Sequence, residues 1–238
     1  MYLDKKIGRN YTRIAIEHVL IICHGLPYEP GSVIEKGYSD LAQFFALRGI
    51  PSLVFDFSGT GLSDGTFSLK LWVEDLINIS HEFEKVSVLG YSMGGAVAVR
   101  AAVEMENLEK LVIAASPCCT ELFDEKVLRM IYENARMKNL LRGAGSYENF
   151  KNLFLREFTE IEPKNWIGEV GEEKLIVHGR RDDIVPFENG LKLYDAAKEP
   201  KAFFEIEEGD HFLRQNAEVS GVIADWLLGK IKDKRIIL

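Results

Sequence analysis

One stretch of ten residues decides the fold: Val86-Ser87-Val88-Leu89-Gly90-Tyr91-Ser92-Met93-Gly94-Gly95. Its first half is a short apolar, β-branched run, which is typical of a buried strand. Its second half leads into small residues that favour a closely packed helix. A strand, a sharp turn and a helix around Gly-x-Ser-x-Gly predict a nucleophile elbow that exposes Ser92 above the sheet edge, with Gly90 and Gly94 giving the turn its room. The alternative at this point is a glycine-rich turn with an idle serine.

Other apolar runs typical of buried strands occur on both sides of this stretch, at residues 18–23, 51–57, 108–116, 174–178 and 201–206, with a short edge strand expected at 13–17. Helical patterns lie between them, at residues 41–47, 68–83, 94–102, 187–198 and 216–230. Strands that alternate with helices form βαβ units. The chain is therefore predicted to be an α/β protein with a mostly parallel sheet flanked by helices.

The alternation breaks once, between Pro117 and Lys174. This part of the chain shows helical stripes and no convincing strand; the stripes comprise Leu122, Val127, Leu128, Ile131, Tyr132, Phe150, Leu153, Phe154 and Phe158. We interpret it as a small helical insertion, here called the cap segment (residues 118–173), over the carboxyl edge of the sheet. The predicted domains are a core of residues 1–117 and 174–238 and this cap segment.

Composition restricts the function classes. The net charge of −8 disfavours binding to nucleic acid or to an anionic membrane surface. No apolar run approaches the roughly 20 residues of a membrane span, and the amino terminus lacks the pattern of a secretory signal. Three cysteines, of which Cys118 and Cys119 are adjacent, make no disulfide framework. We expect a cytoplasmic, reduced protein in which this pair is simply buried, with pocket lining or oxidation as the alternative.

A serine nucleophile needs a base, which an acid holds in place. In a parallel sheet these partners belong in loops at the carboxyl ends of strands. His211 lies in a turn-rich loop after the last predicted strand and is the expected base. The preceding loop, residues 178–186, offers two carboxylates, of which Asp182 is nearer the strand end and Asp183 is the reserve.

The remaining histidines are weaker candidates. His18 begins a strand, at the wrong edge of the sheet, and His81 lies in a predicted helix. His24 and His178 each close a strand before a glycine, which is more typical of structural hydrogen bonding. For the oxyanion of an acyl transfer, the N–H of Met93 is one donor by the geometry of the elbow.

Five motifs, in this order, resemble the α/β-hydrolase superfamily across nearly the whole chain: residues 24–25 (HG), 56–65 (DFSGTGLSDG), 90–95 (GYSMGG), 178–182 (HGRRD) and 209–212 (GDHF). Within it, the chain is similar to small serine carboxylesterases of the cinnamoyl/feruloyl esterase and monoacylglycerol lipase-like groups. The resemblance implies a sheet of six to eight strands, supports Asp182 as the acid, and makes the Leu26 N–H the second oxyanion donor.

We therefore expect a serine hydrolase that cleaves small carboxylic esters, with an uncharged acyl group, through Ser92, His211 and Asp182. A peptidase or amidase with the same triad, or a non-catalytic binding module, is the alternative. No metal-ligand spacing is present, and glycines 59, 61 and 65 fail the dinucleotide-binding pattern, so the prediction includes neither a metal nor a cofactor. Oligomeric state is left open.

Overall fold

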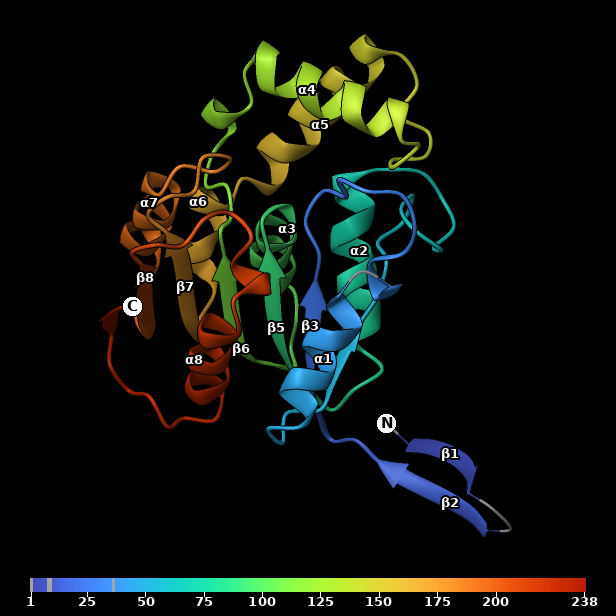
Figure 1. Cartoon of the computed structure of the whole chain (residues 1–238), viewed down its shortest axis with the longest axis vertical. Helices are drawn as coiled ribbons and strands as arrows, with labels where there is room; N and C mark the ends of the chain where they lie inside the picture. Colours follow the sequence, from blue (N-terminus) through green and yellow to red (C-terminus); the bar gives the residue numbers. More distant parts are fainter. Residues whose placement is uncertain (1, 8–9, 36) are drawn as a thin grey trace.

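The computed structural model describes residues 2–7, 10–35 and 37–238. Its centre is a seven-stranded parallel sheet in the order β4-β3-β5-β6-β7-β8-β9 (Figure 1). The strands are β3 (His18–Cys23), β4 (Ser52–Val54), β5 (Lys85–Tyr91), β6 (Leu108–Ala114), β7 (Glu173–Gly179), β8 (Lys201–Ile206) and β9 (Arg235–Ile237). The predicted fold class is confirmed, and seven strands lie within the expected range of six to eight.

Helices cover both faces of this sheet. One face carries α1 (Tyr38–Ala46) and α8 (Ala217–Leu227), and the other carries α2 (Leu69–Ser80), α3 (Met93–Ala102) and α7 (Glu188–Ala196). Alternate residues of β3 enter the two resulting cores, Ile21 with α2 and α3 and Leu20 with α1 and α8. Because both faces are buried, the central strands have continuous apolar sequences, the pattern that predicted a parallel sheet.

Four strands differ from the predictions. Before the main sheet, β1 (Tyr2–Ile7) and β2 (Asn10–Ala15) pair as a separate antiparallel hairpin, where only a short strand at 13–17 was expected. In Figure 1 this hairpin extends away from the body of the molecule. At the sheet edge, β4 is shorter than the predicted strand at 51–57. At the other edge, β9 was not predicted, and it pairs in parallel with β8.

The cap segment joins β6 to β7, which are neighbours in the sheet. Its helices are η2 (Thr120–Leu122), α4 (Glu125–Met137), α5 (Tyr147–Ile161), α6 (Pro163–Trp166) and η3 (Ile167–Glu169). In Figure 1, α4 and α5 lie beyond the carboxyl ends of the strands. The predicted stripes are largely the buried faces of these helices, with Phe150, Phe154 and Phe158 fully enclosed. That this segment is a domain of its own stays a prediction.

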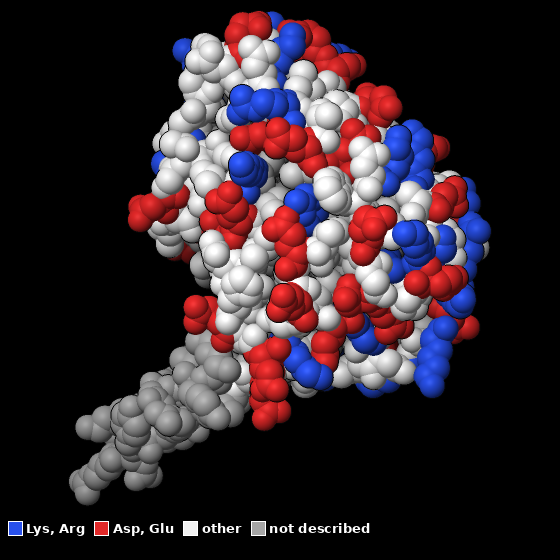
Figure 2. Space-filling view, turned by 180° about the vertical axis from the view of Figure 1, so that it is seen from behind, with Lys and Arg blue, Asp and Glu red and all other residues white. Residues whose placement is uncertain are grey.

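Two surface observations complete the description. No helix in the described part of the chain is long and apolar enough to cross a membrane. On the face seen in Figure 2, acidic and basic side chains are interspersed, without a broad area of one sign.

Candidate active site

Ser92 stands between β5 and α3 in a backbone conformation that side chains rarely adopt. Its φ of 52° is one of few positive values at non-glycine residues of the described chain. The turn needs its two flanking glycines, because a Cβ at Gly90 would lie 2.5 Å from the Gly94 carbonyl oxygen. A Cβ at Gly94 would lie 2.4 Å from the His24 carbonyl oxygen. Backbone strain of this kind is common at functional sites, and here it lifts the serine above the sheet edge.

The structure brings Ser92, His211 and Asp182 into one hydrogen-bonded row. Ser92 Oγ lies 3.0 Å from His211 Nε2. His211 Nδ1 lies 2.9 Å from Asp182 Oδ2 and 3.1 Å from Oδ1. The three side chains come from the carboxyl ends of β5, β8 and β7, the edge where the sequence placed them. Asp183, the reserve acid, is exposed and takes no part in the row.

The Asp182 carboxylate is enclosed by donors. Its side chain has no exposed surface, and Oδ1 accepts hydrogen bonds from the N–H groups of Ile184 (3.0 Å) and Val185 (2.8 Å). Burial alone would raise the pKa of Asp182. The nearby His178 imidazole and the hydrogen bonds from His211 and the Val185 N–H outweigh burial and hold the pKa of Asp182 well below its ordinary value. The carboxylate is therefore charged at neutral pH and accepts the hydrogen bond from His211 Nδ1.

His178 is a neighbour of Asp182 that the sequence analysis assigned only to structural hydrogen bonding. Its ring is fully buried, and Nε2 lies 3.4 Å from Asp182 Oδ2. The signal that could have pointed to it is its place at the end of β7, four residues before the acid. That spacing alone does not say whether the two side chains face each other.

Gly25 lies directly against Ser92. A Cβ at Gly25 would be 2.8 Å from Ser92 Cβ and 3.3 Å from Oγ, so this loop approaches the serine as only glycine allows. The next residue, Leu26, is thus beside the serine. Met93 is the first residue of α3, where N–H groups have no intrahelical acceptor. Leu26 and Met93 thus each follow a residue of the Gly25–Ser92 contact in the sequence, and the use of their N–H groups as an oxyanion hole stays a prediction.

His24 makes hydrogen bonds that stabilise this loop. Its Nδ1 donates to the Gly25 carbonyl oxygen at 2.6 Å, and its Nε2 accepts from the Phe57 N–H at 3.1 Å. Burial lowers the pKa of His24 to about 4, so the ring is neutral at neutral pH. As expected from its position, this histidine makes structural hydrogen bonds.

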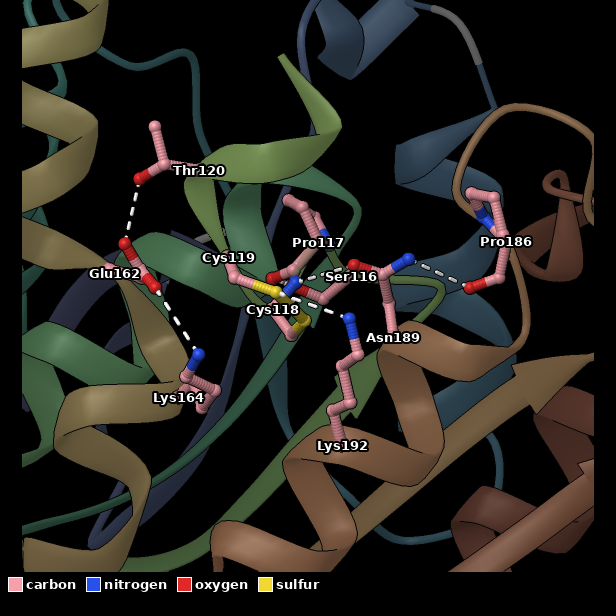
Figure 3. The surroundings of a disulfide bond; sticks show 10 residues. All are labelled: Ser116, Pro117, Cys118, Cys119, Thr120, Glu162, Lys164, Pro186, Asn189 and Lys192. Atoms are coloured by element: carbon pink, nitrogen blue, oxygen red, sulfur yellow. Dashed lines mark hydrogen bonds and ion pairs between the residues drawn. A yellow bond between two sulfur atoms is a disulfide. The ribbon is translucent and has the colours of Figure 1, made fainter. Parts of the chain in front are cut away.

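Cys118 and Cys119 are joined by a disulfide between adjacent residues (Figure 3). The expectation that these cysteines are reduced is therefore wrong for this structure, whereas their burial was predicted correctly. Two side chains of α7 approach the pair: Asn189 Oδ1 accepts from the Cys118 N–H at 3.0 Å, and Lys192 Nζ lies 4.0 Å from Cys119 Sγ. The pair thus joins the beginning of the cap segment to α7.

Known structures share this fold. The monoacylglycerol lipase of Paleococcus ferrophilus superposes with a TM-score of 0.69 at 18% identity, covering 89% of this chain and 94% of the lipase. Est1E of Butyrivibrio proteoclasticus, solved with bound ferulic acid, gives a TM-score of 0.67 at 22% identity, covering 92% and 90%. At these identities the similarity shows the fold alone.

The curated sequence relatives of the chain include uncharacterized proteins. The uncharacterized protein YfhR of Escherichia coli (strain K12) is 39% identical over 180 residues, which are 72% of this chain and 56% of YfhR. The chain thus spans less than two thirds of the length of this curated relative. A model of the family described as serine aminopeptidase, S33, matches residues 15–142, more than half of the chain. The chain therefore belongs to the serine aminopeptidase S33 family, within the α/β-hydrolase superfamily of hydrolases.

Proposed function

We propose that this protein is a serine hydrolase that cleaves carboxylic esters. The observation that carries the proposal is the unbroken row from Ser92 Oγ through both ring nitrogens of His211 to Asp182. Such a row converts a hydroxyl, which is a poor nucleophile at neutral pH, into a reactive one.

In the proposed reaction, Ser92 Oγ attacks the acyl carbon while His211 Nε2 takes the hydroxyl proton. Negative charge develops on the carbonyl oxygen, and the N–H groups of Leu26 and Met93 stabilise it, each by about 3 kcal/mol. His211 then returns the proton to the leaving alcohol, and water attacks the acyl-enzyme by the same route. Asp182 holds the imidazole and stabilises its charged form.

The proposed substrates are small esters with an uncharged acyl group. Leu26 and Met93, the proposed oxyanion donors, are apolar, and so are the cap residues Leu122 and Val127 that pack against the same core. The names of two structural neighbours, a monoacylglycerol lipase and a protein with bound ferulic acid, suggest which substrates to test. These are esters of increasing acyl-chain length and one feruloyl ester.

The first test is Ser92→Ala. We expect its turnover of p-nitrophenyl acetate and butyrate to fall by about 10³-fold or more, because removal of a triad nucleophile leaves only binding and the oxyanion donors. The variant should melt close to the wild-type temperature. Retained turnover in a folded variant would remove the mechanism.

A matched pair of variants tests the acid. Asp182→Asn should lower kcat by about 10⁴-fold, because the amide favours the wrong tautomer of His211. Asp183→Asn removes the same charge one residue away, on an exposed side chain, and should leave kcat unchanged. Equal losses in both variants would reject the assignment of Asp182.

A peptidase or amidase is the second candidate, because the matching family model is described as serine aminopeptidase. Comparison of aminoacyl p-nitroanilides with p-nitrophenyl esters distinguishes the two. Failure of Ser92 to react with a fluorophosphonate probe would instead favour a non-catalytic binding module.

A further inference from the structure

His178 holds its hydrogen on a defined ring nitrogen. Nε2 lies 2.8 Å from the Val185 carbonyl oxygen, which can only accept a hydrogen bond, so Nε2 must be the donor. The same nitrogen lies 3.4 Å from Asp182 Oδ2. The nitrogen that donates to the Val185 carbonyl therefore also lies beside the carboxylate of the proposed catalytic acid.

The other ring nitrogen, Nδ1, faces no hydrogen-bond acceptor among the described residues. Nδ1 is buried and has no hydrogen-bond partner within the described residues. It faces α7 at Gly190, where an added Cβ would lie only 2.7 Å away. A hydrogen on Nδ1 would therefore lack an acceptor, which disfavours that tautomer. The surroundings favour the tautomer with its hydrogen on Nε2.

The charged groups around this histidine leave Asp182 as its acidic partner. Glu205, opposite His178 in the register of β7 and β8, is paired with Arg180 and lies 3.6 Å from Arg235. On the other side of Asp182, His211 donates from Nδ1. The carboxylate thus lies between two imidazoles, one of which faces the serine and one of which does not.

We propose that His178 is a positioning residue, which fixes the Asp182 carboxylate and takes up part of its charge through the Nε2 hydrogen. This inference rests on the proposed function, because it concerns the same triad. Without His178 the carboxylate is held by one contact fewer, so it still faces His211 but in a less well-defined position. Its charge also acts more fully on His211, which makes the general base easier to protonate.

The experiment compares His178→Leu, which removes the donor, with His178→Gln, which can place an amide N–H near the position of Nε2. His81→Gln, on an exposed histidine at the end of α2, is the control. For His178→Leu we expect kcat on p-nitrophenyl acetate to fall about tenfold. The acid limb of its kcat/KM profile should move upward by about half a pH unit. His178→Gln should return both values toward the wild type.

A purely structural histidine would not move the pH limb, so an unshifted limb in folded His178→Leu overturns the inference. If that variant does not fold, the ring nitrogens of wild-type His178 can be read from 15N NMR, with the signal assigned by its loss in His178→Gln. A hydrogen on Nδ1 would also overturn the inference. An inactive wild-type protein would contradict the proposed function itself. An active enzyme whose kcat and pH profile do not change in His178→Leu would contradict only the inference about His178.

Discussion

Two histidines of this chain have the same local sequence context but opposite hydrogen-bonding patterns. His24 and His178 each end an apolar strand and precede a glycine. His24 donates from Nδ1 and accepts at Nε2, whereas His178 donates from Nε2 and leaves Nδ1 unpartnered. The partners are backbone groups, those of Gly25 and Phe57 for His24 and that of Val185 for His178, and every residue offers such groups. For that reason the sequence predicted a structural role for both and did not show that one of them reaches the acid.

His24 gives the residue-scale prediction, which concerns stability. Its pKa is about 4 in the folded protein and about 6.5 in an unfolded chain, so only the unfolded state takes up a proton between these values. The stabilisation is present above about pH 6.5 and is lost as the pH falls toward 4. We expect proton uptake by His24 in the unfolded state to lower the free energy of unfolding by about 3 kcal/mol as the pH falls across that window.

Urea unfolding at about pH 7 and about pH 4.5 measures the effect. His24→Asn cannot titrate, and it should be less stable at neutral pH but lose less stability on acidification than the wild type. If the two proteins lost equal stability over this range, His24 would not be the buried neutral group described above.

At the scale of elements, the sequence predicted the sheet well where strands are buried on both faces. Such strands carry apolar runs because neither side meets water. The prediction was wrong for the edge strands of the sheet. β4 is shorter than the predicted strand, and β9, which has one pairing partner, has no comparable apolar run. The hairpin of β1 and β2 is likewise polar and weakly patterned in sequence. Edge pairing depends on where the chain returns in space, which local composition does not encode.

Helix α7 gives the element-scale prediction. Gly190→Ala would place a methyl group 2.7 to 2.9 Å from three atoms of the His178 side chain, whose ring is fully buried and hydrogen-bonded to Val185. We expect the variant to lose about 1–3 kcal/mol of unfolding free energy and to have a lower kcat, because the displaced ring carries Asp182 with it. Urea unfolding and p-nitrophenyl acetate turnover measure both effects.

Helix α8 contains the matched control. A Cβ at Gly221 would meet no atom within 4 Å, so Gly221→Ala should be neutral or stabilising by up to about 1 kcal/mol. The same chemical change in two helices then separates the effect of helix propensity from the contact with His178. A harmless Gly190→Ala would show that the ring has more room than the structure indicates.

At the scale of the whole molecule, the cap segment packs on the core through apolar side chains and is also hydrogen-bonded to backbone carbonyls of the core. The Arg142 guanidinium donates to the carbonyl oxygens of Gly61 (2.9 Å) and Thr60 (3.1 Å), and Lys138 Nζ donates to that of Tyr28 (2.8 Å). Every residue offers a carbonyl, so no sequence pattern marks these partners. The three proposed catalytic residues were predictable because each lies at a strand end, whereas these ties were not.

One contact between the cap segment and the core is made by a buried carboxylate, and its contribution to stability can be tested. Glu157 of α5 accepts from the Leu69 N–H (2.8 Å) and from Ser68 Oγ (3.0 Å), at the N-terminus of α2, where negative charge is favourable. Glu157→Gln removes the charge and buries an amide group facing donors. We expect it to lower the free energy of unfolding by about 1–3 kcal/mol.

Glu160→Gln makes the same substitution on the exposed side of α5 and should change stability by less than about 0.5 kcal/mol. The two variants therefore separate the contact with α2 from the general effect of one fewer charge in a protein with a net charge of −8. Removing a negative charge from such a protein reduces its self-repulsion, so a general effect would stabilise both variants. Only the loss of a contact between α5 and α2 destabilises Glu157→Gln alone, and equal stability of the two variants would show that this carboxylate does not hold the cap segment to the core.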